Sequence, residues 1–97
     1  MDLNLKITQL KPYNQYVLLE TKSQKTYTLV LEFYGVEKPK INDILVLNEK
    51  LLDPKFQDYC QPYAFAPFEK SDKIGDESEL IGLVCKGKKY ILKRIFG

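Results

Sequence analysis

The chain has 97 residues, of which 15 are basic and 13 acidic, so its formal charge is +2 and its length suits one domain over 1–97. It contains no His and two Cys, which argues against a zinc site, a disulfide framework and a His base. No apolar run approaches the roughly 20 residues that cross a bilayer, and the first ten residues lack the pattern of a signal peptide. We therefore expect a cytoplasmic protein with no cofactor, no bound metal and no membrane partner.

In the first third of the chain, apolar and polar residues alternate as they do in β-strands. Residues 27–34 (YTLVLEFY) place Tyr27, Leu29, Leu31 and Phe33 on one apolar face and a mixed set on the other, which is typical of a half-buried strand. A polar segment, TKSQK, separates this strand from YVLLE, so the two runs together predict a hairpin.

The segment upstream of this hairpin has two interpretations. Apolar and polar residues alternate over 3–10, and Pro12 then interrupts the pattern because proline cannot donate to a strand ladder. Residues 3–20 are therefore either one long strand bent near Pro12 or two short strands.

The middle of the chain opens with the stretch PKINDILVL, residues 39–47. Pro39 and the pair Asn42-Asp43 predict a turn, with Asn42 in a left-handed conformation. The apolar run ILVL predicts a central third strand, buried on both faces. Asn48 then predicts the cap of a short helix over NEKLLD. The segment 53–78 is rich in proline, aromatic and acidic residues, which predicts an irregular connection rather than a regular element.

The last segment, residues 79–96 (ELIGLVCKGKKYILKRIF), predicts a hairpin. Two β-rich runs flank Gly87, which permits the positive φ of a tight turn. The whole order is then strand, strand, strand, short helix, strand, strand.

This order resembles that of the OB-fold, a five-stranded β-barrel. The stretch Lys40-Ile41-Asn42-Asp43-Ile44 is also similar to the lysine, x, glycine, aspartate, aliphatic segment before the third strand of small OB and S1-like barrels of bacterial type, with Asn42 in place of glycine. The resemblance implies a mainly β, OB-like barrel of five strands, and an SH3-like small barrel is the alternative.

OB barrels bind their ligands across strands two and three and with the flanking loops. Both loops are basic in this sequence, and tyrosines lie near them. Because lysine neutralises phosphates and aromatic rings stack on unpaired bases, this combination suggests a surface for single-stranded nucleic acid or another polyanion. The residues of this hypothesis are Lys22, Lys25, Tyr27, Tyr34, Lys86, Lys88, Lys89 and Tyr90. The alternative interpretation is structural: the lysines are solvated turn residues, and the tyrosines pack within the protein.

A second function class is a protein-interaction or assembly module. It would use the aromatic loop 61–68, with Tyr63, Phe65 and Phe68, or a free strand edge. The alternative interpretation is structural: these rings cover the open end of the barrel. Catalysis has no support, because the sequence shows no nucleophile elbow, P-loop or dinucleotide fingerprint. We therefore expect no enzymatic activity, and the sequence leaves the oligomeric state open.

Overall fold

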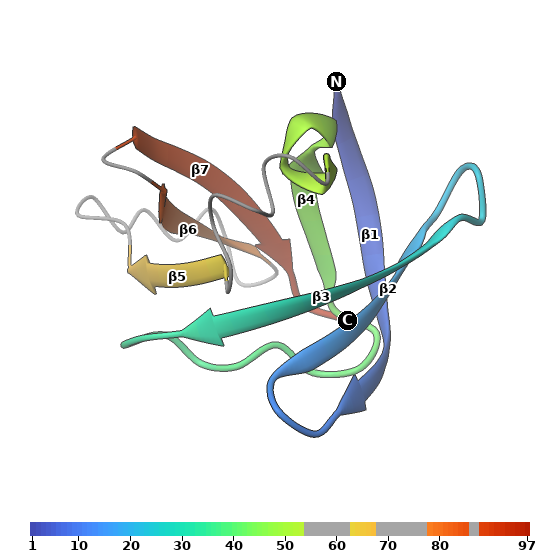
Figure 1. Ribbon diagram of the computed structural model, residues 1–97, viewed down its shortest axis with the longest axis horizontal. Coiled ribbons are helices and arrows are strands. Elements are labelled where there is room, and N and C mark those ends of the chain that lie inside the picture. Colours follow the sequence, from blue (N-terminus) through green and yellow to red (C-terminus); the bar gives the residue numbers. More distant parts are fainter. Residues whose placement is uncertain (54–62, 68–77, 86–87) are drawn as a thin grey trace.

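Figure 1 shows the computed structural model, which describes residues 1–53, 63–67, 78–85 and 88–97; for 63–67, 78–79, 84–85 and 88–89 it describes the backbone alone. Seven strands and one short 3-10 helix follow one another along the chain. They are β1 (Asp2–Lys11), β2 (Gln15–Glu20), β3 (Thr26–Phe33), β4 (Ile44–Asn48), η1 (Glu49–Leu52), β5 (Tyr63–Pro67), β6 (Ser78–Cys85) and β7 (Lys88–Ile95).

The described strands pair in the order β1-β2-β3-β5-β6-β7-β4, and β4 pairs in turn with β1, so the sheet closes into a barrel (Figure 1). All neighbours are antiparallel except β3 and β5, which are parallel. The expectation of a mainly β barrel is confirmed, whereas the expected count of five strands is wrong. Two strands are additional. One arises because the first segment is divided into β1 and β2, and the other is β5, which lies inside the segment expected to be irregular.

Pro12 separates β1 from β2, so the two-strand interpretation of residues 3–20 is correct. Tyr13 and Asn14 follow it with φ angles of 62° and 58°, and this left-handed pair reverses the chain. β2 then runs back along β1, with a change of register between Ile7 and Gln9. That irregularity increases the local bend, as β-bulges do.

The core fills the barrel with leucine and isoleucine from alternate strand positions. In β3 the expected apolar face is confirmed, because Leu29 and Leu31 are buried while Tyr27 and Phe33 are half-buried at its two ends. Tyr16 of β2 contacts Phe33 edge to face, with 5.8 Å between ring centroids. The buried apolar residues are Leu5, Ile7, Tyr16, Leu18, Leu29, Leu31, Leu45, Leu47, Leu51, Leu52, Ile81, Leu83 and Leu92.

The stretch PKINDILVL forms the turn into β4, which pairs with β1 on one side and β7 on the other. Asn42 has a φ of 78°, which confirms the left-handed conformation expected there. The run ILVL is fourth rather than third along the chain. Only alternate residues are fully buried, because the outer face of β4 is half-exposed.

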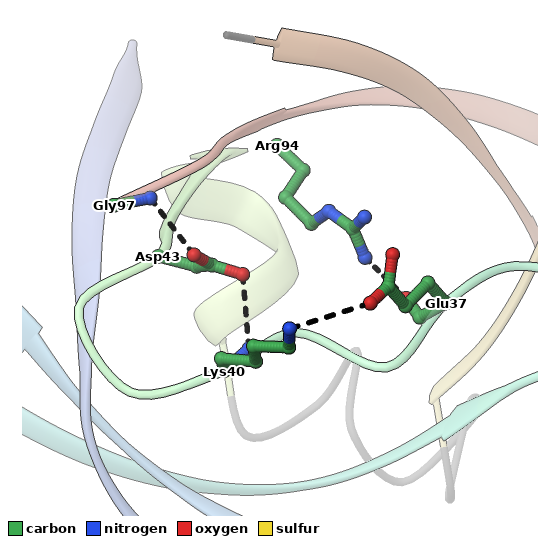
Figure 2. Close-up of polar contacts among 5 residues, drawn as sticks. All are labelled: Glu37, Lys40, Asp43, Arg94 and Gly97. Atoms are coloured by element: carbon green, nitrogen blue, oxygen red, sulfur yellow. Dashed lines mark hydrogen bonds and ion pairs between the residues drawn. The ribbon is translucent and has the colours of Figure 1, made fainter.

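A buried polar cluster holds this turn against the C-terminal strand (Figure 2). The buried carboxylate of Asp43 accepts hydrogen bonds from the backbone N–H groups of Lys40, at 2.9 Å, and Gly97, at 2.8 Å. The guanidinium of Arg94, whose side chain is 1% exposed, donates to the carbonyl of Glu37 and lies over the ring of Phe96. These polar contacts therefore join the turn to the end of β7.

The short helix expected directly after the ILVL strand is confirmed as the 3-10 helix η1. The Asn48 side chain accepts a hydrogen bond from the N–H of Lys50 and so caps it, while Leu51 and Leu52 are buried. Among the described residues, no helix is long and apolar enough to cross a membrane.

Candidate functional site

The turn between β2 and β3, residues 21–25, is organised around a buried carboxylate. Glu20 is 4% exposed and accepts hydrogen bonds from the backbone N–H groups of Lys22, at 3.2 Å, and Ser23. Gln24, with a φ of 60°, donates its N–H to the Glu20 carbonyl and completes the reversal. Hydrogen bonds from the Ser23 hydroxyl and from the two backbone N–H groups lower the pKa of Glu20. Glu20 therefore remains ionised and fixes the conformation of the turn.

A pocket of about 330 Å³ lies between this turn and the beginning of β1. It is lined by residues 1–4, by residues 20–23 and by Tyr27. The wall is mixed in charge, because Asp2 and Glu20 contribute carboxylates and Lys22 contributes an ammonium group. In Figure 1 the β2–β3 turn extends away from the rest of the barrel, at the right of the view.

Three residues of the polyanion hypothesis come together here. Lys22 and Lys25 are both exposed, and the Nζ of Lys25 lies 5.4 Å from the ring centroid of Tyr27. Tyr27 is half-buried and packs against the core. The turn therefore places the ammonium group of Lys25 over an aromatic ring that is only partly accessible, and Lys22 lines the same pocket as this ring.

Tyr34 lies at the opposite end of β3. Seven residues of extended strand place it roughly 20 Å from Tyr27. It is 56% exposed, and its hydroxyl donates to the carboxylate of Glu32. That hydrogen bond, together with burial and the charge of Glu32, raises the pKa of Tyr34. The carboxylate beside it makes this ring a poor platform for a polyanion.

The second basic loop is described only in part. Tyr90 is half-buried against the core, whereas Lys88 and Lys89 are described by their backbone, which pairs with Cys85 and Val84. Lys86 lies outside the described residues. In the barrel, β5 and β6 stand between β3 and β7, so strand pairing does not bring the two basic loops together.

The structure also describes the residues of the protein-interaction hypothesis only in part. Tyr63 and Phe65 belong to β5, where their backbone pairs with Leu31 and Phe33 of β3. Phe68 lies outside the described residues.

Among the described residues, β5 pairs with β3 over Leu31–Phe33, and the segment from Thr26 to Val30 pairs with β2. No pattern within β3 could have predicted its pairing with β5, because this pairing joins β3 to a strand from a distant part of the chain.

Chemistry that needs a bound metal finds no site in the described part of the chain, where no three His, Cys, Asp or Glu side chains gather to hold an ion. No protein-family model, curated protein or solved structure matches the chain.

Proposed function

We propose that the protein is a non-enzymatic binding module that recognises a polyanion, with single-stranded nucleic acid as the leading case, through the β2–β3 turn. The observation that carries this proposal is the position of Lys25 over the Tyr27 ring, with the exposed Lys22 in the same turn and lining the same pocket as Tyr27. Ammonium groups release counterions from phosphates, and the accessible part of the ring offers a stacking surface for a base. An OB-like relationship supports the same surface, because OB barrels use strands two and three. A cytoplasmic location belongs to the same proposal.

Two lysines predict weak and strongly salt-dependent binding. If each neutralises one phosphate, the logarithm of the association constant falls with the logarithm of salt concentration with a slope of about −1.4 for a single strand. Fluorescence anisotropy with a labelled oligothymidine at low salt measures both the affinity and this slope.

The decisive comparison is between two double variants of equal charge. Replacing Lys22 and Lys25 by Ala removes both phosphate contacts, so binding should be lost and the salt slope should approach zero. Replacing Lys11 and Lys50 by Ala removes the same charge from exposed positions outside the turn, and binding should persist. The proposal is wrong if the wild-type protein does not bind at low salt, or if the two variants weaken binding equally.

A protein-interaction module is the second candidate, and the aromatic residues of the loop 61–68 favour it, because aromatic side chains concentrate interface energy. Replacement of Phe65 by Ser tests this candidate. A partner captured from the source cell by the wild type and lost in this variant, with the fold retained, would support an interface there.

A further inference from the structure

Two further lysines lie on the outer surface of the barrel. Lys6 lies between two buried residues of β1, and Lys93 lies between two buried residues of β7, so both side chains point away from the core. Both are partly exposed. Because β4 pairs with β1 on one side and with β7 on the other (Figure 1), the two lysines belong to the outer face of one continuous part of the sheet.

Lys6 is close to the β2–β3 turn because the turn lies directly against β1. The Thr21 N–H donates to the Asn4 carbonyl, at 3.0 Å, and Lys6 is two residues farther along β1. Lys22 follows Thr21 in the chain, so its backbone lies beside the same part of β1. The positive charge of the turn therefore continues onto the outer face of β1.

β4 connects Lys6 to Lys93. Lys6 pairs with Ile44 of this strand, and Lys93 pairs with Val46, two residues farther along. Strands lie about 4.8 Å apart and rise about 3.4 Å per residue, so roughly 12 Å separates the Cα atoms of the two lysines. The two ammonium groups are therefore close enough to contact phosphates of one short polymer.

The residues directly across the strand pairs from Lys6 and Lys93 are all aliphatic. These neighbours are Leu19 and Ile44 for Lys6, and Val46 and Leu80 for Lys93. A lysine in such a place lays its stem along the aliphatic side chains and keeps its ammonium group in water. An opposite charge across a strand pair would neutralise the lysine, and these four neighbours carry no charge. The two ammonium groups therefore present their charge to solvent.

The lysines of the turn and of the outer face form one line over the barrel surface, which we call the lysine path. Its members are Lys25, Lys22, Lys6 and Lys93. From the end of β2 to β7 the path crosses three strand spacings, or roughly 14 Å. A stacked single strand rises about 3.4 Å per nucleotide, so this length corresponds to about four nucleotides. A linear polyanion can therefore contact all the lysines of the path, whereas one compact anion cannot.

From this arrangement we propose that the protein binds an extended single strand of nucleic acid, which starts at the β2–β3 turn and runs over β1 and β4 to Lys93. This inference rests on the proposed function and extends its site onto the outer face of the barrel. The Tyr27 ring anchors the strand at the turn, and Lys6 and Lys93 add phosphate contacts farther along. These two lysines extend the site and do not replace the turn.

The salt dependence of binding measures how many lysines of the path contact phosphates. With a labelled oligothymidine of about eight nucleotides, the wild-type protein should show a slope of about −2.8, because each lysine of the path neutralises one phosphate. Lys6→Gln together with Lys93→Gln keeps most of each stem and removes both charges, so the slope should fall to about −1.4. Lys6→Arg together with Lys93→Arg keeps both charges and should retain the wild-type slope.

The matched control is the double change Lys11→Gln and Lys50→Gln. It removes the same charge from exposed positions outside the lysine path, and its slope should equal that of the wild-type protein. If this control lowers the slope as much as the change at Lys6 and Lys93 does, net charge and not the path determines binding, and the proposal is overturned.

A shorter strand tests the direction of the path. About three nucleotides span roughly 10 Å, so a thymidine trinucleotide anchored at the turn stops short of Lys93. Its slope should be close to −1.4, and Lys93→Gln should leave its affinity unchanged while weakening the longer strand. Equal weakening of both strands by Lys93→Gln would contradict an extended strand that starts at the turn.

The failure of this inference differs from the failure of the proposed function. If the wild-type protein binds neither strand at low salt, the function itself is wrong. If the change at Lys22 and Lys25 abolishes binding while the change at Lys6 and Lys93 leaves the slope at its wild-type value, the turn is the whole site and only the lysine path is overturned.

Discussion

In each of two turns of the described structure, a single buried carboxylate holds the backbone in place. Glu20 binds the backbone of the β2–β3 turn, and Asp43 binds the backbone of the turn before β4 together with Gly97. In both cases a side chain supplies the acceptor that backbone N–H groups need when no strand partner is available. The conformation of Asn42 could be predicted from the sequence, because Asn tolerates positive φ. The bond from Gly97 to Asp43 could not, since it joins residues brought together only by the closed barrel.

Glu20 should make stability depend on pH. The pKa of its carboxyl is lowered in the folded protein, so its contribution is fully present above the ordinary value of 4.5 and is lost as pH falls through the lowered pKa. Glu20→Gln should reduce the melting temperature at pH 7, and the difference from wild type should shrink below about pH 4.5. Thermal melts from pH 7 to pH 3 measure this. An equal difference at every pH would show that the charge of Glu20 does not stabilise the turn.

Asp43 should contribute more through its two acceptor oxygens than through its volume. Asp43→Ala removes the acceptor of two part-buried hydrogen bonds, from the N–H groups of Lys40 and Gly97, and a hydrogen bond to a charged group contributes about 1.5–3 kcal/mol. Asp43→Asn keeps one carbonyl oxygen and should recover part of the loss. Urea denaturation of both variants gives the two free energies of unfolding, and equal values would contradict this account.

Individual elements differ in how far the sequence predicts them. The alternation of β3 is local, so its inner face was predicted correctly and Leu29 and Leu31 are buried. β5 was missed because Pro62 precedes it and Pro67 is its last residue, and because its parallel partner among the described strands, β3, lies about thirty residues away in the chain. Long-range pairing also explains why the sequence did not predict the separation of the two basic loops. Lys22, Lys25 and Tyr27 come together because one hairpin carries them, whereas Tyr90 belongs to a strand whose place is set by long-range pairing.

The β1–β2 turn holds Tyr13 in a backbone conformation that non-glycine residues do not favour. Tyr13 adopts a φ of 62°, a conformation that costs a non-glycine residue about 1 kcal/mol, and its side chain is 87% exposed. Tyr13→Gly should therefore stabilise the protein by up to about 1 kcal/mol, offset in part by the greater freedom of glycine in the unfolded chain. Urea denaturation measures the change. Destabilisation instead would show that the exposed ring makes a stabilising contact.

At the scale of the whole molecule, the two tyrosines of the polyanion hypothesis that flank β3 lie at opposite ends of the strand. Tyr27 lies beside the basic β2–β3 turn, with the Nζ of Lys25 over its ring, whereas the hydroxyl of Tyr34 donates to the carboxylate of Glu32. A polyanion bound at the turn should therefore contact Tyr27 and not Tyr34.

This separation gives the last prediction. Tyr27→Leu keeps apolar bulk against the core but removes the ring, so it should weaken binding of a labelled oligothymidine at low salt. Tyr34→Leu is the matched control and should leave the affinity unchanged, because Tyr34 lies at the other end of β3 beside a carboxylate. Fluorescence anisotropy measures both affinities. If the two variants weaken binding equally, the β2–β3 turn is not the binding surface.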